Sequence, residues 1–208
     1  HMLRHTMGDL TYFQALRDYL DIHAWGNVVT EDFQLVMESH FGSDLNWFFE
    51  QWIYGNGHPE YYFKWAGSSS KVKVSISQQT TCTYPSVFTM PLDIHLQGLG
   101  DDEEIQVVWA DEVENNFLLA TSFIPSNVTL DPNGWVLGYY LGSEIGLLGD
   151  INLDNQINIL DIIAIANFIL YETELTDDQF FLSDIDGDNS ISIMDIIQIV
   201  NIILYNTT

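Results

Sequence analysis

Apolar residues recur at helical spacing in the first quarter of the chain, and this spacing predicts three short helices. Apolar side chains that lie three or four positions apart share one face of a helix. Three groups have this spacing: Leu10, Phe13, Leu16 and Leu20; then Phe33, Val36, Met37 and Phe41; then Leu45, Phe48, Phe49, Trp52 and Ile53. Thr30 and Asp44 are predicted to cap the second and third helices, because their side-chain oxygens can accept a backbone N–H in the first turn. The turn GNGHP at 55–59 ends the third helix.

Between residues 61 and 142 the pattern changes to short runs that are rich in β-branched and aromatic residues. These runs are 61–65, 72–77, 92–96, 105–109, 117–120, 128–130 and 135–140. Turn-forming clusters separate them, for example GSSS at 67–70 and DPNG at 131–134. About seven short strands at this spacing favour an antiparallel β-sandwich.

The last section of the chain contains an internal repeat. The stretch GDINLDNQINILDIIAIANFILY, which begins at Gly149, aligns without gaps to SDIDGDNSISIMDIIQIVNIILY, which begins at Ser183. The two copies are 34 residues apart and are identical at 14 of 23 positions. Each copy starts with a polar stretch and ends with an apolar run, so a repeated loop-plus-helix unit is predicted.

Each copy of the repeat spaces oxygen-bearing side chains as a calcium-binding loop does. Such a loop surrounds Ca²⁺ with roughly six to eight oxygens, drawn from loop positions one, three, five, seven, nine and twelve. The predicted ligands are Asp150, Asn152, Asp154, Gln156, Asn158 and Asp161 in the first copy and Asp184, Asp186, Asp188, Ser190, Ser192 and Asp195 in the second, with Gln156 and Ser190 contributing backbone carbonyls. Oxygen ligands without His or Cys argue against zinc. We therefore expect two Ca²⁺ ions.

Two loop positions depart from the usual calcium loop. Position six is Asn155 and Asn189 where Gly is usual, and Asn is the residue after Gly that best tolerates positive φ. Position twelve is Asp where Glu is usual, so the following helix must sit closer to the loop. A pair of Asx-rich turns on a solvated acidic face would explain one such loop, but two copies in register favour calcium binding.

The charge of the chain restricts its partners. Thirty acidic residues stand against five basic ones, which gives a net charge of −25, and no Lys or Arg follows Lys73. This acidic surface repels phosphate backbones and anionic lipids, so neither nucleic acid nor membrane is an expected partner. No apolar run approaches the roughly 18 residues that a bilayer span needs. The single cysteine, Cys82, excludes a disulfide within the chain and is interpreted as a small buried residue.

Each copy has the pattern D-x-[ND]-x-D-x-x-I-[NS]-x-x-D and consists of a loop and a helix, without an entering helix before the loop. Together the two copies resemble a type I dockerin, and the resemblance covers about Gly149 to Tyr205. The resemblance implies an all-α module with EF-hand-like loops that folds on binding two Ca²⁺. It further implies that the module docks onto a cohesin module of a scaffold or cell-surface protein, as in a cellulosome-like assembly.

The dockerin resemblance also places the partner-binding residues, at loop positions ten and eleven and further along each helix. They are Ile159, Leu160, Ile193 and Met194, with Val200 and Asn201 added. Apolar residues in such helices also build cores. Core placement is preferred for Ile162, Ile165 and Ile169, whereas core and interface stay open for the four loop positions.

Roughly residues 2–141 resemble the region that follows the active site in aminopeptidase N-like zinc metallopeptidases, the gluzincins. The stretches that carry the resemblance are MLRHTMGDLTYFQALRDYL, VVTEDFQLVMESHFGSDL and DLNWFFEQWIYGNGHPEYYFKW, followed by VFTMPLDIHL and NVTLDPNGWVL. The resemblance implies that the helices belong to a catalytic lobe and lead into a β-sandwich. We expect the chain to begin within a longer protein.

The chemistry of that family needs residues that this sequence lacks. Gluzincins use H-E-x-x-H on a helix and a downstream Glu to hold zinc and to activate its bound water. His1 and His5 are four positions apart, but residue 2 is Met where the motif requires Glu, and His58 lies in a turn. We therefore expect no peptidase activity from this chain, with zinc only in a missing catalytic part.

Together these patterns predict a multidomain α+β chain. Residues 1–58 are expected to be helices of a catalytic lobe, residues 59–143 a β-sandwich and residues 144–208 a dockerin. The expected function is to tether a secreted metallopeptidase to a cohesin-bearing scaffold, at an extracellular or cell-surface location of bacterial type, where Ca²⁺ is abundant.

Two alternatives stay open. The dockerin can pack in cis on the β-sandwich as a calcium-dependent staple, which the short connector at 142–148 favours. The β-sandwich can also bind sugars through Trp109, Trp135, Tyr139 and Tyr140, although strand alternation more simply makes these core residues.

Overall fold

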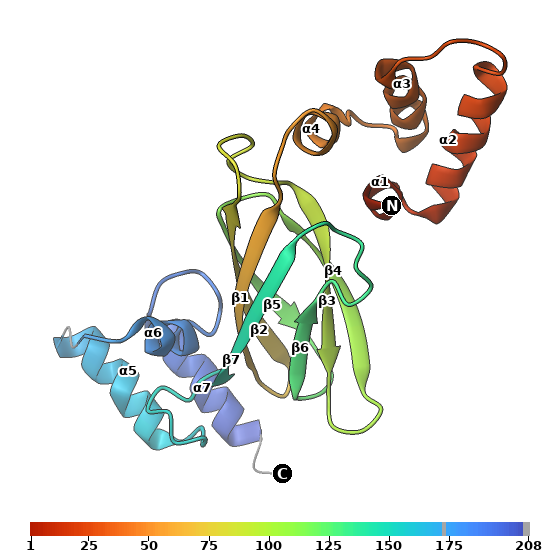
Figure 1. The fold of residues 1–208 in the computed structure, drawn as a ribbon. Coiled ribbons are helices and arrows are strands. Elements are labelled where there is room, and N and C mark those ends of the chain that lie inside the picture. Colours follow the sequence, from red (N-terminus) through yellow and green to blue (C-terminus); the bar gives the residue numbers. More distant parts are fainter. Residues whose placement is uncertain (172–173, 206–208) are drawn as a thin grey trace.

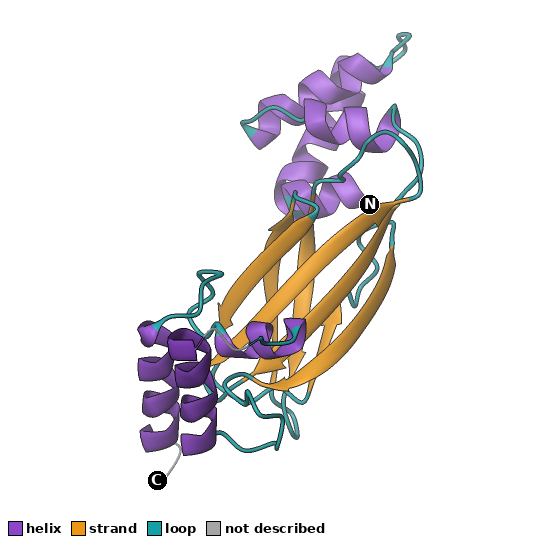
Figure 2. Cartoon of the chain, turned by 90° about the vertical axis from the view of Figure 1, so that its left-hand side faces the viewer, coloured by secondary structure: helices purple, strands orange, loops and turns teal. Residues whose placement is uncertain are grey.

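The computed structural model describes residues 1–171 and 174–205 and has helices at both ends of a central β region (Figure 1). The N-terminal helices lie at one end of the strands, and the C-terminal helices lie at the other. Figure 2 shows the same arrangement from the side, with the strands running along the length of the molecule. The chain is therefore elongated, and its two ends belong to different helical groups.

The N-terminal part contains α1 (Met2–Met7), α2 (Asp9–Ile22), α3 (Thr30–Phe41), α4 (Asn46–Phe48) and the π-helical η1 (Phe49–Ile53). The three predicted helices are present, and α1 is an additional one. The capping prediction for Thr30 is wrong, because Thr30 is the first helical residue and the Asp32 carboxylate accepts the N–H of Val29 at 2.9 Å. Asp44 does accept the N–H of Asn46, at 2.8 Å, where α4 begins.

Seven strands form two sheets, and we call residues 59–147 the two-sheet unit. The strands are β1 (Pro59–Gly67), β2 (Lys71–Thr80), β3 (Met90–Gln97), β4 (Glu103–Ala110), β5 (Glu114–Ala120), β6 (Asn127–Leu130) and β7 (Tyr139–Leu147). One sheet has the order β5-β2-β1-β7 and the other has the order β4-β3-β6. Alternate residues such as Val74 of β2 and Ile94 of β3 are fully buried and join one hydrophobic core.

Strand β7 differs from the prediction in both position and direction. It starts at Tyr139 and not at Trp135, so most of the predicted connector at 142–148 is strand and the predicted boundary at 143 falls inside it. It pairs with β1 in parallel, so the four-stranded sheet is mixed and not purely antiparallel. The late start follows from a turn at Asp131, whose φ is 46° and whose carboxylate accepts the N–H groups of Trp135 and Val136 at 2.8 Å each.

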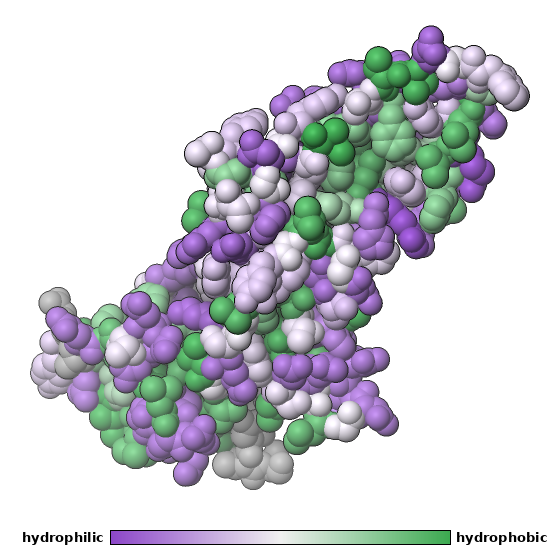
Figure 3. Space-filling model, viewed as in Figure 1, coloured by the Kyte–Doolittle hydropathy of each residue, from purple (hydrophilic) through white to green (hydrophobic). Residues whose placement is uncertain are grey.

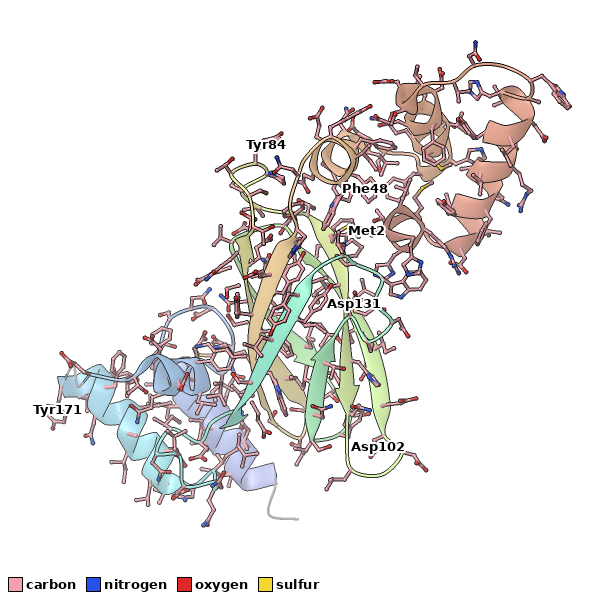
Figure 4. All side chains as sticks on the ribbon, in the orientation of Figure 1. Met2, Phe48, Tyr84, Asp102, Asp131 and Tyr171 are labelled. Carbon is pink, nitrogen blue, oxygen red and sulfur yellow. The ribbon has the colours of Figure 1, made fainter. Side chains whose placement is uncertain are left out.

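The N-terminal helices and the two-sheet unit share one hydrophobic core. Met37 of α3 and Phe48 of α4 are buried in the same cluster as the inner faces of the sheets. In Figure 4 the labelled Met2 and Phe48 lie where the helices meet the end of the strands. His5 of α1 adds a polar contact, with its Nε2 3.2 Å from Oδ1 of Asp93 in β3. The helices are thus packed on the sheets and do not extend away from them.

We call residues 148–205 the repeat module. It contains α5 (Ile159–Tyr171), α6 (Asp177–Ser183) and α7 (Ile193–Tyr205), of which α5 and α7 are the predicted helices of the two copies. Helix α6 was not predicted. It precedes the second loop, so the prediction that the copies have no entering helix is wrong for the second copy. A capping box starts this helix: Gln179 donates its N–H to the Thr176 hydroxyl at 3.2 Å and accepts the N–H of Thr176 at 3.1 Å.

The repeat module has a core of its own that includes part of the two-sheet unit. Its buried residues are Leu148, Ile151, Ile165, Phe181, Leu182, Ile185 and Ile199, together with Ala66 of β1. Figures 1 and 2 show α6 beside the strands of the four-stranded sheet. The backbone continues directly from β7 into the module, and Leu148 donates its N–H to the carbonyl of Gly67 at 2.9 Å. The module therefore rests against the outer face of that sheet.

The surface combines hydrophilic residues with apolar patches. In Figure 3 the apolar patches lie over the N-terminal helices and over the repeat module. No helix in residues 1–171 or 174–205 has both the length and the apolar character that crossing a membrane requires.

Candidate metal centre

The two predicted calcium loops, residues 150–161 and 184–195, have matching internal hydrogen bonds. In each loop the aspartate at position one accepts the backbone N–H groups of positions five and six. Asp150 accepts from Asp154 at 3.1 Å and from Asn155 at 2.7 Å, and Asp184 accepts from Asp188 at 3.1 Å and from Asn189 at 3.2 Å. The sequence repeat is thus also a structural repeat, in which the first carboxylate organises the turn.

Positions four and six of both loops have left-handed backbone. The φ angles are 61° at Leu153, 62° at Asn155, 75° at Gly187 and 63° at Asn189. The prediction that Asn adopts positive φ at position six is confirmed. Position four was not predicted, and the two copies differ there, because Gly187 adopts this conformation freely whereas Leu153 bears a Cβ at a cost of about 1–2 kcal/mol. The first loop is therefore the more strained copy.

The aspartates at position twelve, Asp161 and Asp195, tie the helices to their loops. Both are fully buried in the first turns of α5 and α7. Asp161 accepts the N–H groups of Ile151 and Asn158 at 2.8 Å each, and Asp195 accepts those of Ile185 and Ser192 at the same distance. These bonds hold each helix start directly against the loop that precedes it.

The predicted ligands at positions seven and nine shape the backbone in this structure. Asn158 Oδ1 accepts the N–H of Leu160 at 2.8 Å, and Ser192 Oγ accepts that of Met194 at 3.0 Å. These are the local side-chain bonds that favour a helix start. Gln156 and Ser190 donate their N–H groups to the carboxylates at position five, at 2.9 and 2.8 Å. A ligand role for these four residues stays a prediction.

The second loop brings three carboxylates together. One oxygen each from Asp184, Asp186 and Asp188 lies within 4.8 Å of the others. In the first loop Asn152 stands at the middle position and donates its Nδ2 to Asp154 Oδ2 at 3.0 Å. A compact donor set made of oxygens alone suits a hard divalent cation such as Ca²⁺. The residues present therefore fit the ion that the sequence predicts.

The surroundings of two of the loop carboxylates destabilise their ionised form. Burial raises the pKa of Asp150, although the N–H groups of Asn155 and Asp154 oppose this effect. Desolvation also raises the pKa of Asp186, and the negative charge of Asp195 adds to it. A bound cation would relieve both effects, because it stabilises the ionised carboxylate.

The structure adds a residue at this site that the sequence interpretation missed. Lys73 of β2 places its Nζ 2.7 Å from Oδ2 of Asp184, and both side chains are almost completely buried. Burial lowers the pKa of Lys73, while the hydrogen bond and the charge of Asp184 oppose this shift. The only signal in the sequence was that Lys73 is the last basic residue of a strongly acidic chain.

The residues predicted to bind a partner lie on the surface of the repeat module. Ile159 is 62% exposed and Ile193 is 68% exposed. Leu160, Met194, Val200 and Asn201 are exposed as well. For the residues that were assigned to the core, Ile165 is fully buried and Ile162 half-buried, but Ile169 is exposed, so that part of the prediction is wrong.

The four aromatic residues considered for sugar binding do not form one platform. Trp109 of β4 lies edge-on to Trp47 of α4. Trp135 stacks on His5 with ring centroids 5.0 Å apart. The Tyr140 hydroxyl donates to Asp131 at 3.1 Å, and Tyr139 is half exposed. These side chains face different neighbours, so a shared role is not supported.

Comparison with known proteins matches the C-terminal part to a family. Residues 148–204 match the type I dockerin domain. No curated protein matches the chain. The chain is similar in fold to the crystal structure of Legionella pneumophila aminopeptidase A in complex with aspartic acid, with a TM-score of 0.56 and 15% identity, over 97% of this chain and 28% of that one. The chain thus spans 28% of the length of that aminopeptidase, and both calcium loops lie within a type I dockerin match.

Proposed function

We propose that the repeat module is a calcium-dependent dockerin that tethers its parent protein to a cohesin module of a scaffold or surface protein. The observation that carries this proposal is the pair of loops with matching hydrogen bonds inside the type I dockerin match. Type I dockerins bind cohesin modules and are typically found on extracellular or cell-surface proteins. An extracellular location of bacterial type would supply Ca²⁺ at concentrations that fill even weak sites.

The proposed ligands are those at loop positions one, three, five, seven, nine and twelve, with one Ca²⁺ in each loop. Calcium supplies a positive charge around which the carboxylates can pack. The buried aspartates at positions one and twelve link the loop to the helix that follows it, so ion binding and helix placement would be coupled.

The proposed partner surface is made of the exposed apolar residues at the start of α5 and α7. Ile159, Leu160, Ile193 and Met194 are all more than half exposed while the module rests on the two-sheet unit. Buried apolar anchors supply most of the energy of protein–protein interfaces. Docking in cis leaves these four residues accessible, and this exposure supports a cohesin contact at the same time as the cis contact.

For residues 1–147 we propose the non-catalytic C-terminal part of a gluzincin-type metallopeptidase. The support is the sequence resemblance and the similarity in fold to an aminopeptidase. The chain contains no H-E-x-x-H motif. We therefore propose that it does not hydrolyse peptides itself, and that zinc belongs to a catalytic part of the parent protein.

Binding to purified type I cohesin modules tests the tethering proposal. We expect the chain to bind at least one member of a cohesin panel in excess calcium and to lose that binding in EGTA, as surface plasmon resonance would show. Two double variants, Ile159→Asp with Leu160→Asp and Ile193→Asp with Met194→Asp, probe the proposed surface. At least one of them should weaken binding by about 30-fold or more, because it places a charge in an apolar interface.

The matched control is the double variant Leu10→Asp with Leu20→Asp, which puts the same two charges on exposed apolar residues of α2. It should bind as the unchanged chain does. Cohesin binding that persists at full strength in both double variants would contradict the proposed surface. Failure to bind any cohesin would contradict the tethering function.

A second candidate function is a calcium-dependent staple, in which the repeat module stabilises the two-sheet unit in cis. Three lysines of the two-sheet unit support it. Lys71 Nζ donates to Gln198 Oε1 at 2.8 Å, Lys64 Nζ lies 3.9 Å from Asp178 Oδ1, and Lys73 contacts Asp184. The two functions use different surfaces of the module, so one chain can perform both.

A further inference from the structure

The contact between the two-sheet unit and the second calcium loop is built on one row of residues across the four-stranded sheet. Ala66 of β1, Lys73 of β2 and Leu118 of β5 are direct neighbours in the strand register. Val72 and Val74, which flank Lys73, point to the opposite face and are buried in the main core. The row therefore lies on the outer face of the sheet, under α6 and the second loop.

Both apolar residues of this row contact the repeat module. Ala66 is fully buried in the module's core, and Leu118 packs against the same core from its edge. A side chain at Gly187, in the second loop, would lie 3.5 Å from Leu118. The lysine in the middle of the row is thus enclosed by packed residues on both sides.

The ammonium of Lys73 has an acceptor for each of its three protons. It donates to Oδ2 of Asp184 at 2.7 Å, to the backbone carbonyl of Asp184 at 2.7 Å and to that of Phe181 at 3.1 Å. The two carbonyls lie at the C-terminal end of α6, where a helix presents partial negative charge. The Phe181 ring lies beneath the ammonium, 4.9 Å from Nζ.

The two loops differ in charge, and this difference explains why, among the described residues, a lysine contacts only the second loop. Among the predicted ligands, the first loop carries three carboxylates, Asp150, Asp154 and Asp161. The second loop carries four, Asp184, Asp186, Asp188 and Asp195, because an aspartate replaces Asn152. The positive charge of Lys73 restores the balance, since four negative charges and one positive charge leave −3, the same as in the first loop.

We propose that Lys73 is a built-in counter-cation of the second calcium loop, which lowers the calcium affinity of this more acidic loop towards that of the first. The inference rests on the proposed calcium function. A calcium ion in the second loop would share the Asp184 carboxylate with the Lys73 ammonium. Because both are positively charged, each weakens the attraction between Asp184 and the other. By the same linkage, calcium in the second loop weakens the contact of Lys73 with the module, and this effect opposes the stabilisation that calcium gives the staple by ordering the module.

The test is a calorimetric calcium titration of the intact chain in which the first loop has been silenced by Asp150→Ala. In this background Lys73→Met should raise the calcium affinity of the second loop by about tenfold, within the usual range of coupling between sites. Lys73→Gln is a second neutral variant that keeps a hydrogen-bonding group. It should also raise the calcium affinity of the second loop, and it replaces the methionine variant in the test if that variant does not fold.

Two controls separate charge from docking. Lys71→Met removes another lysine that contacts the module, but on α7 and away from the loop, and should leave the affinity unchanged. Lys73→Arg retains the charge and should also leave it unchanged. A gain in either control would overturn the inference, because docking geometry and not charge would then set the affinity.

The remaining outcomes discriminate between this inference and the function on which it rests. If both neutral variants bound calcium as tightly as the unsubstituted chain or more weakly, and the unsubstituted chain bound it normally, the role of Lys73 alone would be overturned. Absence of calcium binding in the unchanged chain would overturn the calcium module together with this inference.

Discussion

Asp184→Ala is expected to be among the most damaging single substitutions in the repeat module. In calcium-free buffer it should lower the local stability of the module by about 3–5 kcal/mol, because it leaves the buried ammonium of Lys73 without its counter-charge. It also removes the acceptor for the N–H groups of Asp188 and Asn189. Amide hydrogen exchange of α7, read by mass spectrometry, measures this loss as faster exchange.

The repeat supplies a matched control for this prediction. Asp150→Ala removes the equivalent carboxylate of the first loop, which accepts backbone N–H groups but has no lysine partner among the described residues. Its cost should be smaller, about 1–3 kcal/mol, the range for buried donors that lose an acceptor. Equal costs for the two substitutions would show that the contact between Lys73 and Asp184 contributes nothing to stability.

Phe181→Ala is expected to release the repeat module from the two-sheet unit. The ring is 95% buried, lies 4.8 Å from Nζ of Lys64 and 4.9 Å from Nζ of Lys73, and belongs to the module's core. Removing a buried phenyl ring costs about 3–5 kcal/mol. Amide exchange in α6 and in β2 should therefore increase together.

The neighbouring residue provides the control. Phe180→Ala makes the same chemical change at a ring that is 37% exposed, and it should cost well under half as much. If Phe181→Ala increased exchange in α6 but left β2 protected, the two parts would not be coupled through this ring.

The positions of most helices and strands followed from local periodicity, because the spacing of apolar residues is a local property of the sequence. The α2 and α3 segments and β1 to β6 lie where alternation or helical spacing placed them. Helix α1 escaped prediction because it is short, with Leu3 and Met7 as its buried residues. The parallel pairing of β7 with β1 joins residues about 80 positions apart, and no local pattern encodes that pairing.

The calcium loops were predictable for a different reason. Their ligand spacing lies within twelve residues and is repeated, so the sequence alone could indicate all the carboxylates that the structure brings together. Lys73 could not be found in this way. It lies 111 positions from Asp184, and a lysine between two valines of a strand is ordinarily a solvated residue. Only the tertiary contact shows that it belongs to the loop.

The most direct test of the central claim is a calorimetric calcium titration of the intact chain. The proposed dockerin predicts two bound Ca²⁺ ions per chain, with slower amide exchange in α5 and α7 once both loops are filled. A chain that binds no calcium, or that binds it without any change of exchange in these helices, would contradict the assignment of the repeat module as a calcium-dependent docking domain.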